Sequence, residues 1–180
     1  MIGSNSGIIF DAHKPTVKLL AEELSTTFQK ADEDNNLKYT DEAFELVFME
    51  EILRDVCDTY ERRIRIYEPI VSSVVESLAN DLFTATGIHR LVPVKDSIQE
   101  FVIHVQSALD CLKDLLENDE DMINLMLTKK QHAKDNEYEI DASIHEDVEL
   151  LIEEYARRLN SILLETSYLL KKVESKQVCG

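Results

Sequence analysis

The stretch from Phe44 to Leu78, FELVFMEEILRDVCDTYERRIRIYEPIVSSVVESL, decides the fold, because it predicts one helix far longer than the average helix of a globular protein. Thr40 is a good N-cap for this helix, and Asp41 and Glu42 suit the positive end of its dipole. Proline removes a backbone donor, so we expect Pro69 to kink the helix. The apolar residues recur about every four positions, as expected for one buried face: Phe44, Phe48, Ile52, Val56, Tyr60, Ile64, Tyr67, Val71, Val74 and Leu78.

A second long helix is predicted after a turn that covers Asp81 to Val92 and contains Gly87. Ser97 and Glu100 have the spacing of a capping box, in which each side chain satisfies a backbone donor at the start of the helix. The apolar residues that follow fall on one helical face: Ile98, Phe101, Val102, Val105, Leu109, Leu112 and Leu116.

A third long helix is predicted downstream of a polar stretch, Gln131 to Ala142, and extends to about Lys176. Ser143 and Glu146 form a second capping box at its start. Its apolar face carries Val148, Leu151, Ile152, Tyr155, Leu159, Ile162, Leu163, Leu169 and Val173.

The N-terminal part differs from the rest. Gly7 to Phe10 predicts a short strand, and Pro15 is well placed in the first turn of a helix that runs to about Lys30, before the acidic linker Ala31 to Lys38. A single strand is not stable alone, so we expect residues 1–38 to be the tail end of an N-terminal α/β domain. Residues 39–180 would form the long-helix bundle. The predicted fold is mainly α, with long antiparallel helices in an elongated bundle and a small strand-helix remnant.

The charge of the chain limits its partners. With 36 acidic and 19 basic residues among 180, the net charge is -17, which argues against nucleic acid and anionic membranes as partners. Cations and basic partners are favoured instead. An odd number of widely spaced cysteines fits a reducing compartment, and we expect the chain as given to be soluble, since no apolar run approaches the length of a membrane span.

The motifs of known enzymes are missing, so we expect no enzymatic activity. No glycine-rich phosphate loop or nucleophile elbow is present, and Glu149 stands where a zinc protease would need a second histidine after His145. The basic residues Arg62, Arg63 and Arg65 are predicted to pair with acidic neighbours rather than to bind a ligand.

One acidic cluster suggests a cation site. Glu117, Asp119, Glu120 and Asp121 follow directly after the apolar face of the second helix. Oxygen ligands at this density suit magnesium or calcium, and magnesium keeps several waters and takes only one or two carboxylates. The alternative from composition alone is a solvated helix junction without a specific ion.

Several segments resemble the CorA-type magnesium transporters of the eukaryotic, mitochondrial-type branch. Leu115 to Lys130, LLENDEDMINLMLTKK, is similar to the family's acidic stretch followed by Leu-Thr-x-Lys. Ser143 to Tyr155, SIHEDVELLIEEY, resembles the start of its longest helix, and Phe44-Glu45 with Glu50 resembles an upstream motif in which Ala43 replaces a proline. Together with a weaker similarity over Gly7 to Leu24, these segments occur in the family's order.

The resemblance implies the soluble magnesium-sensing region of a transporter, without the two transmembrane helices and the Gly-Met-Asn motif that conduct the ion. This chain would therefore not conduct by itself. Its partners would be divalent cations and further copies, as a pentamer in the full-length protein, with membrane contact only through segments absent from this chain. The parent would be an integral protein of the mitochondrial inner membrane or another intracellular membrane, with this region on the matrix or cytosolic side.

The resemblance also implies weak, regulatory Mg²⁺ bound by carboxylates between subunits. Asp119, Glu120 and Asp121 are the first candidates as ligands, followed by Glu117. Glu100 is a second candidate on the preceding helix, although a capping role explains it better. Five copies at -17 each would carry -85, so cations between them would relieve repulsion. The alternative function is a helical scaffold or coiled-coil adaptor that binds no specific ion.

Overall fold

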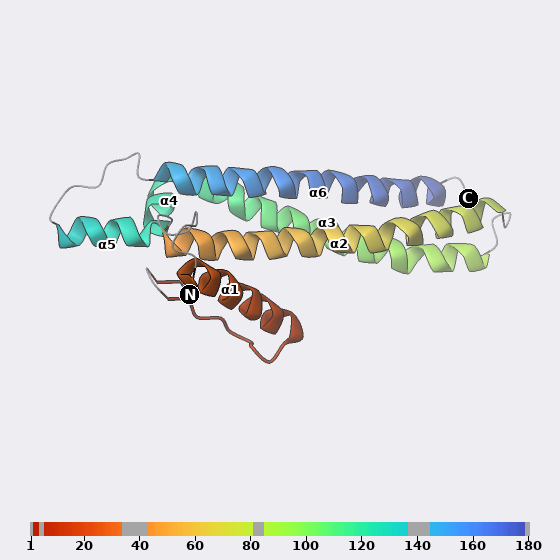
Figure 1. Ribbon diagram of the computed structural model, residues 1–180. Coiled ribbons are helices and arrows are strands. Elements are labelled where there is room, and N and C mark those ends of the chain that lie inside the picture. Colours follow the sequence, from red (N-terminus) through yellow and green to blue (C-terminus); the bar gives the residue numbers. More distant parts are fainter. Residues whose placement is uncertain (1, 4–5, 34–42, 81–84, 137–144, 179–180) are drawn as a thin grey trace. The chain divides into compact units, whose positions relative to one another are not determined.

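The computed structural model describes residues 2–3, 6–33, 43–80, 85–136 and 145–178, and the residues in these ranges form six helices (Figure 1). The mainly α fold is confirmed. The helices are α1 (Pro15–Glu33), α2 (Phe44–Asn80), α3 (Ala85–Leu116), α4 (Asp119–Leu125), α5 (Leu127–Asp135) and α6 (Glu146–Val178). Among the described residues, no helix contains a stretch both long and apolar enough to span a bilayer.

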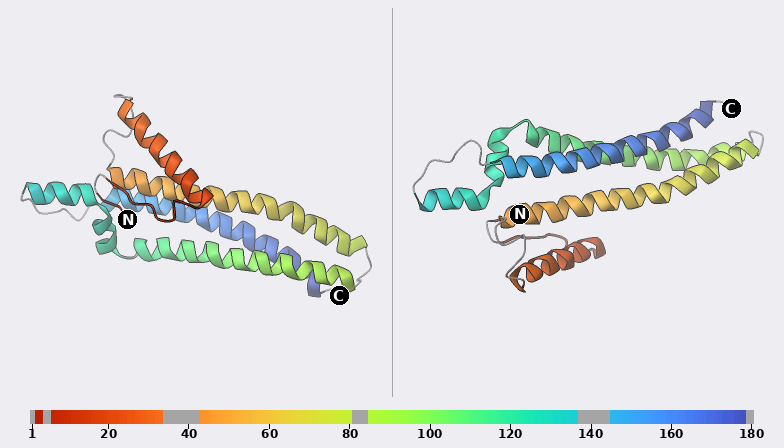
Figure 2. Two further views of the ribbon diagram at one scale, coloured as in Figure 1. Left: turned by 90° about the horizontal axis from the view of Figure 1, so that it is seen from below. Right: turned by 45° about the horizontal axis from the view of Figure 1, so that its top comes forward.

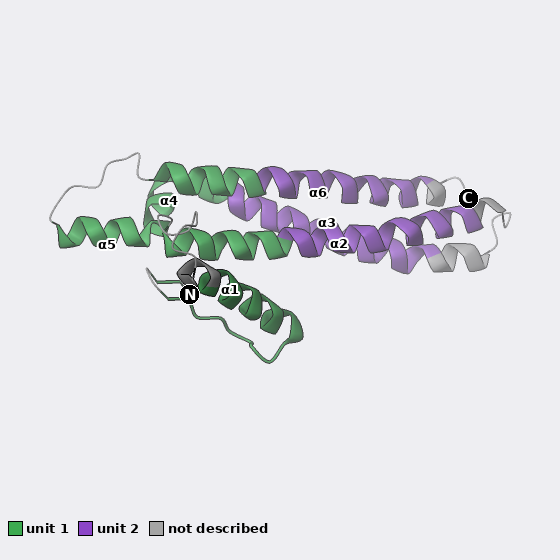
Figure 3. Ribbon diagram, in the orientation of Figure 1, with its two compact units in different colours: residues 1–56, 114–155 green, residues 57–113, 156–180 purple. Residues whose placement is uncertain are grey.

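The chain divides into two compact units (Figure 3). Unit 1 contains residues 1–56 and 114–155, and unit 2 contains residues 57–113 and 156–180. The long helices α2 and α6 each contribute to both units. The predicted domain boundary between residues 38 and 39 lies outside the described residues and stays a prediction.

Unit 2 is a bundle of three helices. In α6, Arg158 bonds Asp58 and Lys172 bonds Ser72, so α2 and α6 run in the same direction. The helix α3 runs the opposite way between the same ends (Figures 1 and 2). From Leu159 onward, the buried residues of α6 alternate at spacings of three and four, which is the pattern of a coiled coil: Leu159, Ile162, Thr166, Leu169 and Val173.

In unit 2, the buried residues Ile64, Tyr67 and Val71 of α2 follow the same alternation rather than a strict spacing of four. A residue every four positions advances about 40° around the helix at each step, so the predicted stripe leaves the core face. Of its members, Phe48, Ile64, Tyr67 and Val71 are buried, and the side chain of Leu78 is outside the described residues. The remaining members are half-buried: Phe44, Ile52, Val56, Tyr60 and Val74.

The predicted turn at Asp81 to Val92 is wrong from residue 85 onward. The helix α3 already begins at Ala85 and continues through Pro93. Leu91 is buried, and this burial outweighs the low helix propensity of the nearby glycine and proline. The capping box of Ser97 and Glu100 is therefore also wrong, because both residues lie inside α3.

Two further local predictions are corrected. At the N-terminus, the predicted strand Gly7 to Phe10 is reduced to an isolated bridge between Gly7 and Ile2, because no neighbouring strand extends the pairing in the described part of the chain. In the polar stretch that begins at Gln131, residues 131–135 belong to α5. The caps predicted at Thr40 and Ser143 lie outside the described residues.

The helix from Pro15 is confirmed, and in unit 1 it is attached to the start of α2. The ring of Phe28 stacks on that of Phe44, with their centroids 4.7 Å apart. Next to this contact, a Cβ added at Gly7 would overlap the ring of Phe48, so Gly7 allows the N-terminal segment to lie directly against α2. The first turns of α2 therefore hold both α1 and the segment before it.

We predict that Phe101→Ala destabilises the protein by about 3–5 kcal/mol, because it opens a cavity in the core of unit 2. The Phe101 side chain is fully buried, and its ring contacts those of Tyr60 and Tyr67. Ile103→Ala is the matched control in the same helix, since Ile103 is 57% exposed. Urea unfolding should show a change of less than about 0.5 kcal/mol for the control. Equal losses in the two variants would contradict the assignment of the core.

Candidate functional site

The candidate cation ligands lie at the start of α4. We call Glu117, Asp119, Glu120 and Asp121 the acidic segment; all four are exposed. The last three form the first turn of α4, where the helix dipole stabilises negative charge. Asn118 is the N-cap, and its side-chain oxygen accepts hydrogen bonds from the backbone N–H groups of Glu120 at 3.1 Å and Asp121 at 3.3 Å. These carboxylates therefore sit on a defined turn.

Side chains on the opposite side of this turn are buried. Met122 is 1% exposed, and Met126, which joins α4 to α5, is fully buried. The side-chain amide of Asn118 also donates a 2.8 Å hydrogen bond to Asp121, so that carboxylate has a structural role as well. The packing of Met122 and Met126 holds the backbone while the carboxylates face water.

The part of the chain that the structure describes contains no preformed metal cage. Within the described ranges, no three or more His, Cys, Asp or Glu side chains come together in a group that could hold a metal ion. A hydrated magnesium ion does not need such a group, because water supplies most of its ligands. Glu100 is exposed in the middle of α3 and belongs to unit 2, so the structure gives it no capping role.

A buried carboxylate that bonds the start of α5 was missed from the sequence. Glu45, in the first turn of α2, is only 1% exposed. One of its oxygens accepts a hydrogen bond from the backbone N–H of Thr128, and the other accepts one from the Thr128 hydroxyl, each at 2.7 Å. Both residues lie in segments singled out for their resemblance, but nothing in their spacing indicates that they meet across 83 positions.

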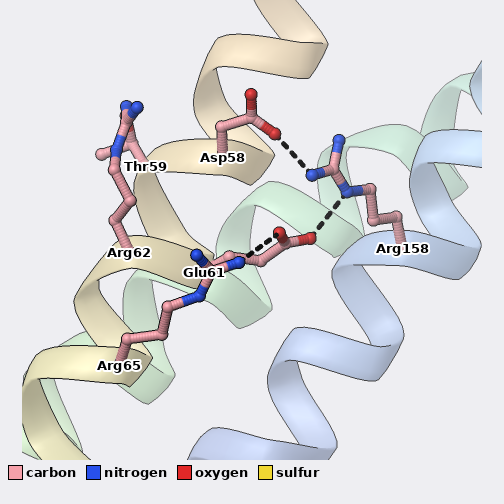
Figure 4. Close-up of polar contacts among 6 residues, drawn as sticks. All are labelled: Asp58, Thr59, Glu61, Arg62, Arg65 and Arg158. Carbon is pink, nitrogen blue, oxygen red and sulfur yellow. Dashed lines mark hydrogen bonds and ion pairs between the residues drawn. The ribbon is translucent and has the colours of Figure 1, made fainter.

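In unit 2, Asp58, Glu61 and Arg65 of α2 and Arg158 of α6 form a cluster of polar contacts (Figure 4). From α6, Arg158 donates to Glu61 at 2.7 Å and to Asp58 at 2.5 Å, and the hydrogen bond with Glu61 raises the pKa of its guanidinium. A guanidinium nitrogen of Arg65 lies 4.0 Å from a carboxylate oxygen of Glu61, which confirms the predicted pairing for this arginine. Arg62 donates a 2.8 Å hydrogen bond to the hydroxyl of Thr59. The cluster therefore joins α2 to α6 within unit 2.

The third arginine of the basic run has an aromatic environment. The guanidinium of Arg63 lies 4.8 Å from the centre of the Phe101 ring, and its Nε donates to the hydroxyl of Tyr67 at 3.2 Å. The Tyr67 hydroxyl in turn shares a 2.7 Å hydrogen bond with Ser97 of α3. Arg63 therefore contributes to the packing of α2 against α3, and the pairing with acidic residues predicted for it is replaced by these contacts.

Comparison with known proteins gives a family and several relatives. The family model "Magnesium transporter MRS2-like" matches residues 1–178. The mitochondrial magnesium transporter MRS2 of Saccharomyces cerevisiae is 25% identical over 173 residues, which are 94% of this chain and 34% of that protein. The mitochondrial inner membrane magnesium transporter MRS2 of Kluyveromyces lactis is 22% identical over 183 residues, 98% of this chain and 40% of the relative.

A third relative, the mitochondrial inner membrane magnesium transporter mrs2 of Schizosaccharomyces pombe, is 24% identical over 186 residues. The match includes 100% of this chain and 42% of that protein. The chain thus spans between a third and less than half of the length of these fungal relatives.

The buried thiol of unit 2 gives a prediction for pH dependence. Burial raises the pKa of Cys57 to about 11 from an ordinary value of 9.0. The folded protein therefore keeps a proton that the unfolded chain releases above pH 9, so stability is lost as the pH rises from 9 towards 11. By pH 10 this loss should be about 1 kcal/mol, and Cys57→Ala should remove it. Chemical unfolding at pH 8 and pH 10 measures the difference.

Cys111→Ala is the control, because the Cys111 side chain is exposed. This variant should lose stability with pH as the unsubstituted protein does. A Cys57→Ala variant with the same pH dependence as both would show that Cys57 titrates normally.

Proposed function

The chain belongs to the family of MRS2-like magnesium transporters, and from this premise we propose that it forms a magnesium-sensing, regulatory region of such a transporter. Mg²⁺ would bind weakly at the acidic segment, mainly through its own water shell. The observation that carries this proposal is the position of these carboxylates: they are exposed, but they lie on a turn fixed by Asn118 and Met122.

The acidic segment differs from the other acidic helix start in unit 1. In the first turn of α6, the Asp147 carboxylate pairs with the Lys129 ammonium group at 2.7 Å. Among the described residues, none of the four carboxylates of the acidic segment forms a salt bridge with a basic side chain. A divalent cation would therefore gain more by binding there than at the start of α6.

Several copies of the chain would strengthen the need for cations. We propose a homo-oligomer, a pentamer in the full-length protein, in which Asp119, Glu120, Asp121 and Glu117 of one copy share Mg²⁺ with a neighbour. Glu100, which is exposed on α3, is a further candidate for such a shared ion. At -17 per copy, loss of the ions would restore repulsion and shift the assembly towards a looser state.

The names of the relatives support a location for the parent protein. All three fungal relatives are described as mitochondrial, and two of them as proteins of the inner membrane. We propose the same membrane for the protein to which this chain belongs, with the helical region outside the bilayer. Magnesium transport itself would be a property of that longer protein.

A helical scaffold is the second candidate function, because α6 leaves large apolar side chains exposed. Leu164 is 64% exposed and Tyr168 is 67% exposed, one helical turn apart. Analytical ultracentrifugation in magnesium and in chelator separates the two functions. Assembly that is the same in both conditions would favour the scaffold.

The proposed site predicts weak binding of magnesium by the purified chain. Calorimetric titration at millimolar Mg²⁺ should give a saturable signal, and a triple variant with Asp119→Asn, Glu120→Gln and Asp121→Asn should weaken binding about tenfold or more, because the carboxylates that attract the ion are gone.

The matched control removes three carboxylates from the first turn of α6, with Glu146→Gln, Asp147→Asn and Glu149→Gln. It has the same net charge as the site variant and should bind Mg²⁺ nearly as well as the unsubstituted chain. Equal weakening in both variants would mean that total charge, and not the acidic segment, attracts the ion.

A further inference from the structure

The buried carboxylate of Glu45 has no place in the proposed function so far. Burial of a charged group is costly unless hydrogen bonds replace its water. Glu45 meets this condition through Thr128, which donates a 2.7 Å hydrogen bond to each of its two carboxylate oxygens. A hydrophobic residue would fill the same position without this cost, so the carboxylate points to a specific role at Thr128.

That role is the capping of α5. Met126 occupies the N-cap position of α5 and makes no side-chain cap hydrogen bond. Thr128 is the second residue of the helix, so its N–H is one of the donors that the helix itself cannot satisfy. The Glu45 carboxylate accepts from this donor and also places negative charge at the positive end of the helix dipole.

The helix α5 depends on this external cap. It has only nine residues, and a helix of that length is marginal in water without tertiary contacts. Ala133 is its one buried residue within the described part of the chain, so little apolar packing is available to hold the helix in place. Loss of the Glu45 contact should therefore release the first turn of α5.

The first turn of α5 is directly connected to the acidic segment. Met126 alone separates α5 from α4, and it is fully buried together with Met122. The Met126 backbone N–H also bonds the carbonyl of Ile123 at 3.2 Å, which ties the joint to the last turn of α4. The short helix α4 cannot keep its orientation if this joint moves.

We propose that Glu45 is a positioning residue for the acidic segment: by capping α5 it holds the α4–α5 joint, and through that joint it sets the affinity of the acidic segment for Mg²⁺. This inference rests on the proposed function. It adds a residue from a distant part of the chain that contacts neither the ion nor its ligands.

The test uses the full chain with four single substitutions. Glu45→Gln removes the charge, and Thr128→Val removes the hydroxyl but keeps the backbone N–H. Glu51→Gln is the control for charge, since Glu51 is also buried in α2 but bonds Arg54. Thr128→Ser is the control for the hydroxyl. Calorimetric titration with MgCl2 measures affinity, and hydrogen exchange measures the opening of α5.

Glu45→Gln and Thr128→Val should each weaken Mg²⁺ binding about fivefold, a typical size for coupling between two sites. They should also speed hydrogen exchange at the start of α5. The two controls should stay within about twofold of the unsubstituted chain in affinity. A merely structural role would speed exchange without changing the affinity.

Three results would overturn the inference. The first is normal Mg²⁺ affinity in Glu45→Gln and Thr128→Val despite faster exchange in α5, which leaves the proposed function intact. The second is equal weakening by Glu51→Gln, which would assign the effect to charge alone. The third is no saturable binding by the unsubstituted chain, in which case the proposed function fails as well.

Discussion

The alternation of buried residues at spacings of three and four along the long helices is the constraint on which the bundle depends. A straight helix keeps one face towards its neighbours over many turns only if the buried positions follow this spacing. In unit 2, α6 meets it from Leu159 to Val173, and α2 meets it from Ile64 to Val71. Polar contacts then fix direction and register. The contacts of Arg158 with Asp58 and of Lys172 with Ser72 align α2 and α6 side by side in parallel, because each contact joins residues 100 positions apart.

The helices could be predicted from the sequence because their signal is local and repeated. Few glycines and prolines interrupt long stretches of apolar periodicity, so the existence of α1, α2, α3 and α6 was correctly predicted. The start of α3 could not be predicted in the same way. Gly87 and Pro93 indicate a turn by local propensity, whereas the burial of Leu91 depends on residues from other helices. The capping box at Ser97 was wrong for the same reason: a short motif indicates a helix start only if the helix does not continue upstream.

The site was only partly predictable. The density of carboxylates at Asp119 to Asp121 is a property of composition, and the sequence is enough to suggest a cation there. The cap at Asn118 is also a local feature, since Asn is a favoured residue at that position. By contrast, the contact of Glu45 with Thr128 joins positions 83 apart, and a glutamate among apolar residues gives no indication of its partner. Long-range hydrogen bonds of this kind depend on how the helices pack, which periodicity does not specify.

The exposed position of the acidic segment fits the sensing function that we propose. A site that encloses a metal with several protein ligands holds it tightly, and it would stay occupied over the whole range of concentrations that a regulator must distinguish. Exposed carboxylates on a fixed turn leave most of the coordination shell to water, so occupancy changes with the concentration of the ion. Such a site has little binding energy to move a subunit by itself. In the oligomer that we propose, the strong negative charge of the chain would supply the rest, because each ion that leaves would increase repulsion between neighbouring copies. A sensor of the kind we propose would need a rigid turn more than a deep site, so the contacts behind the acidic segment would matter as much as its carboxylates.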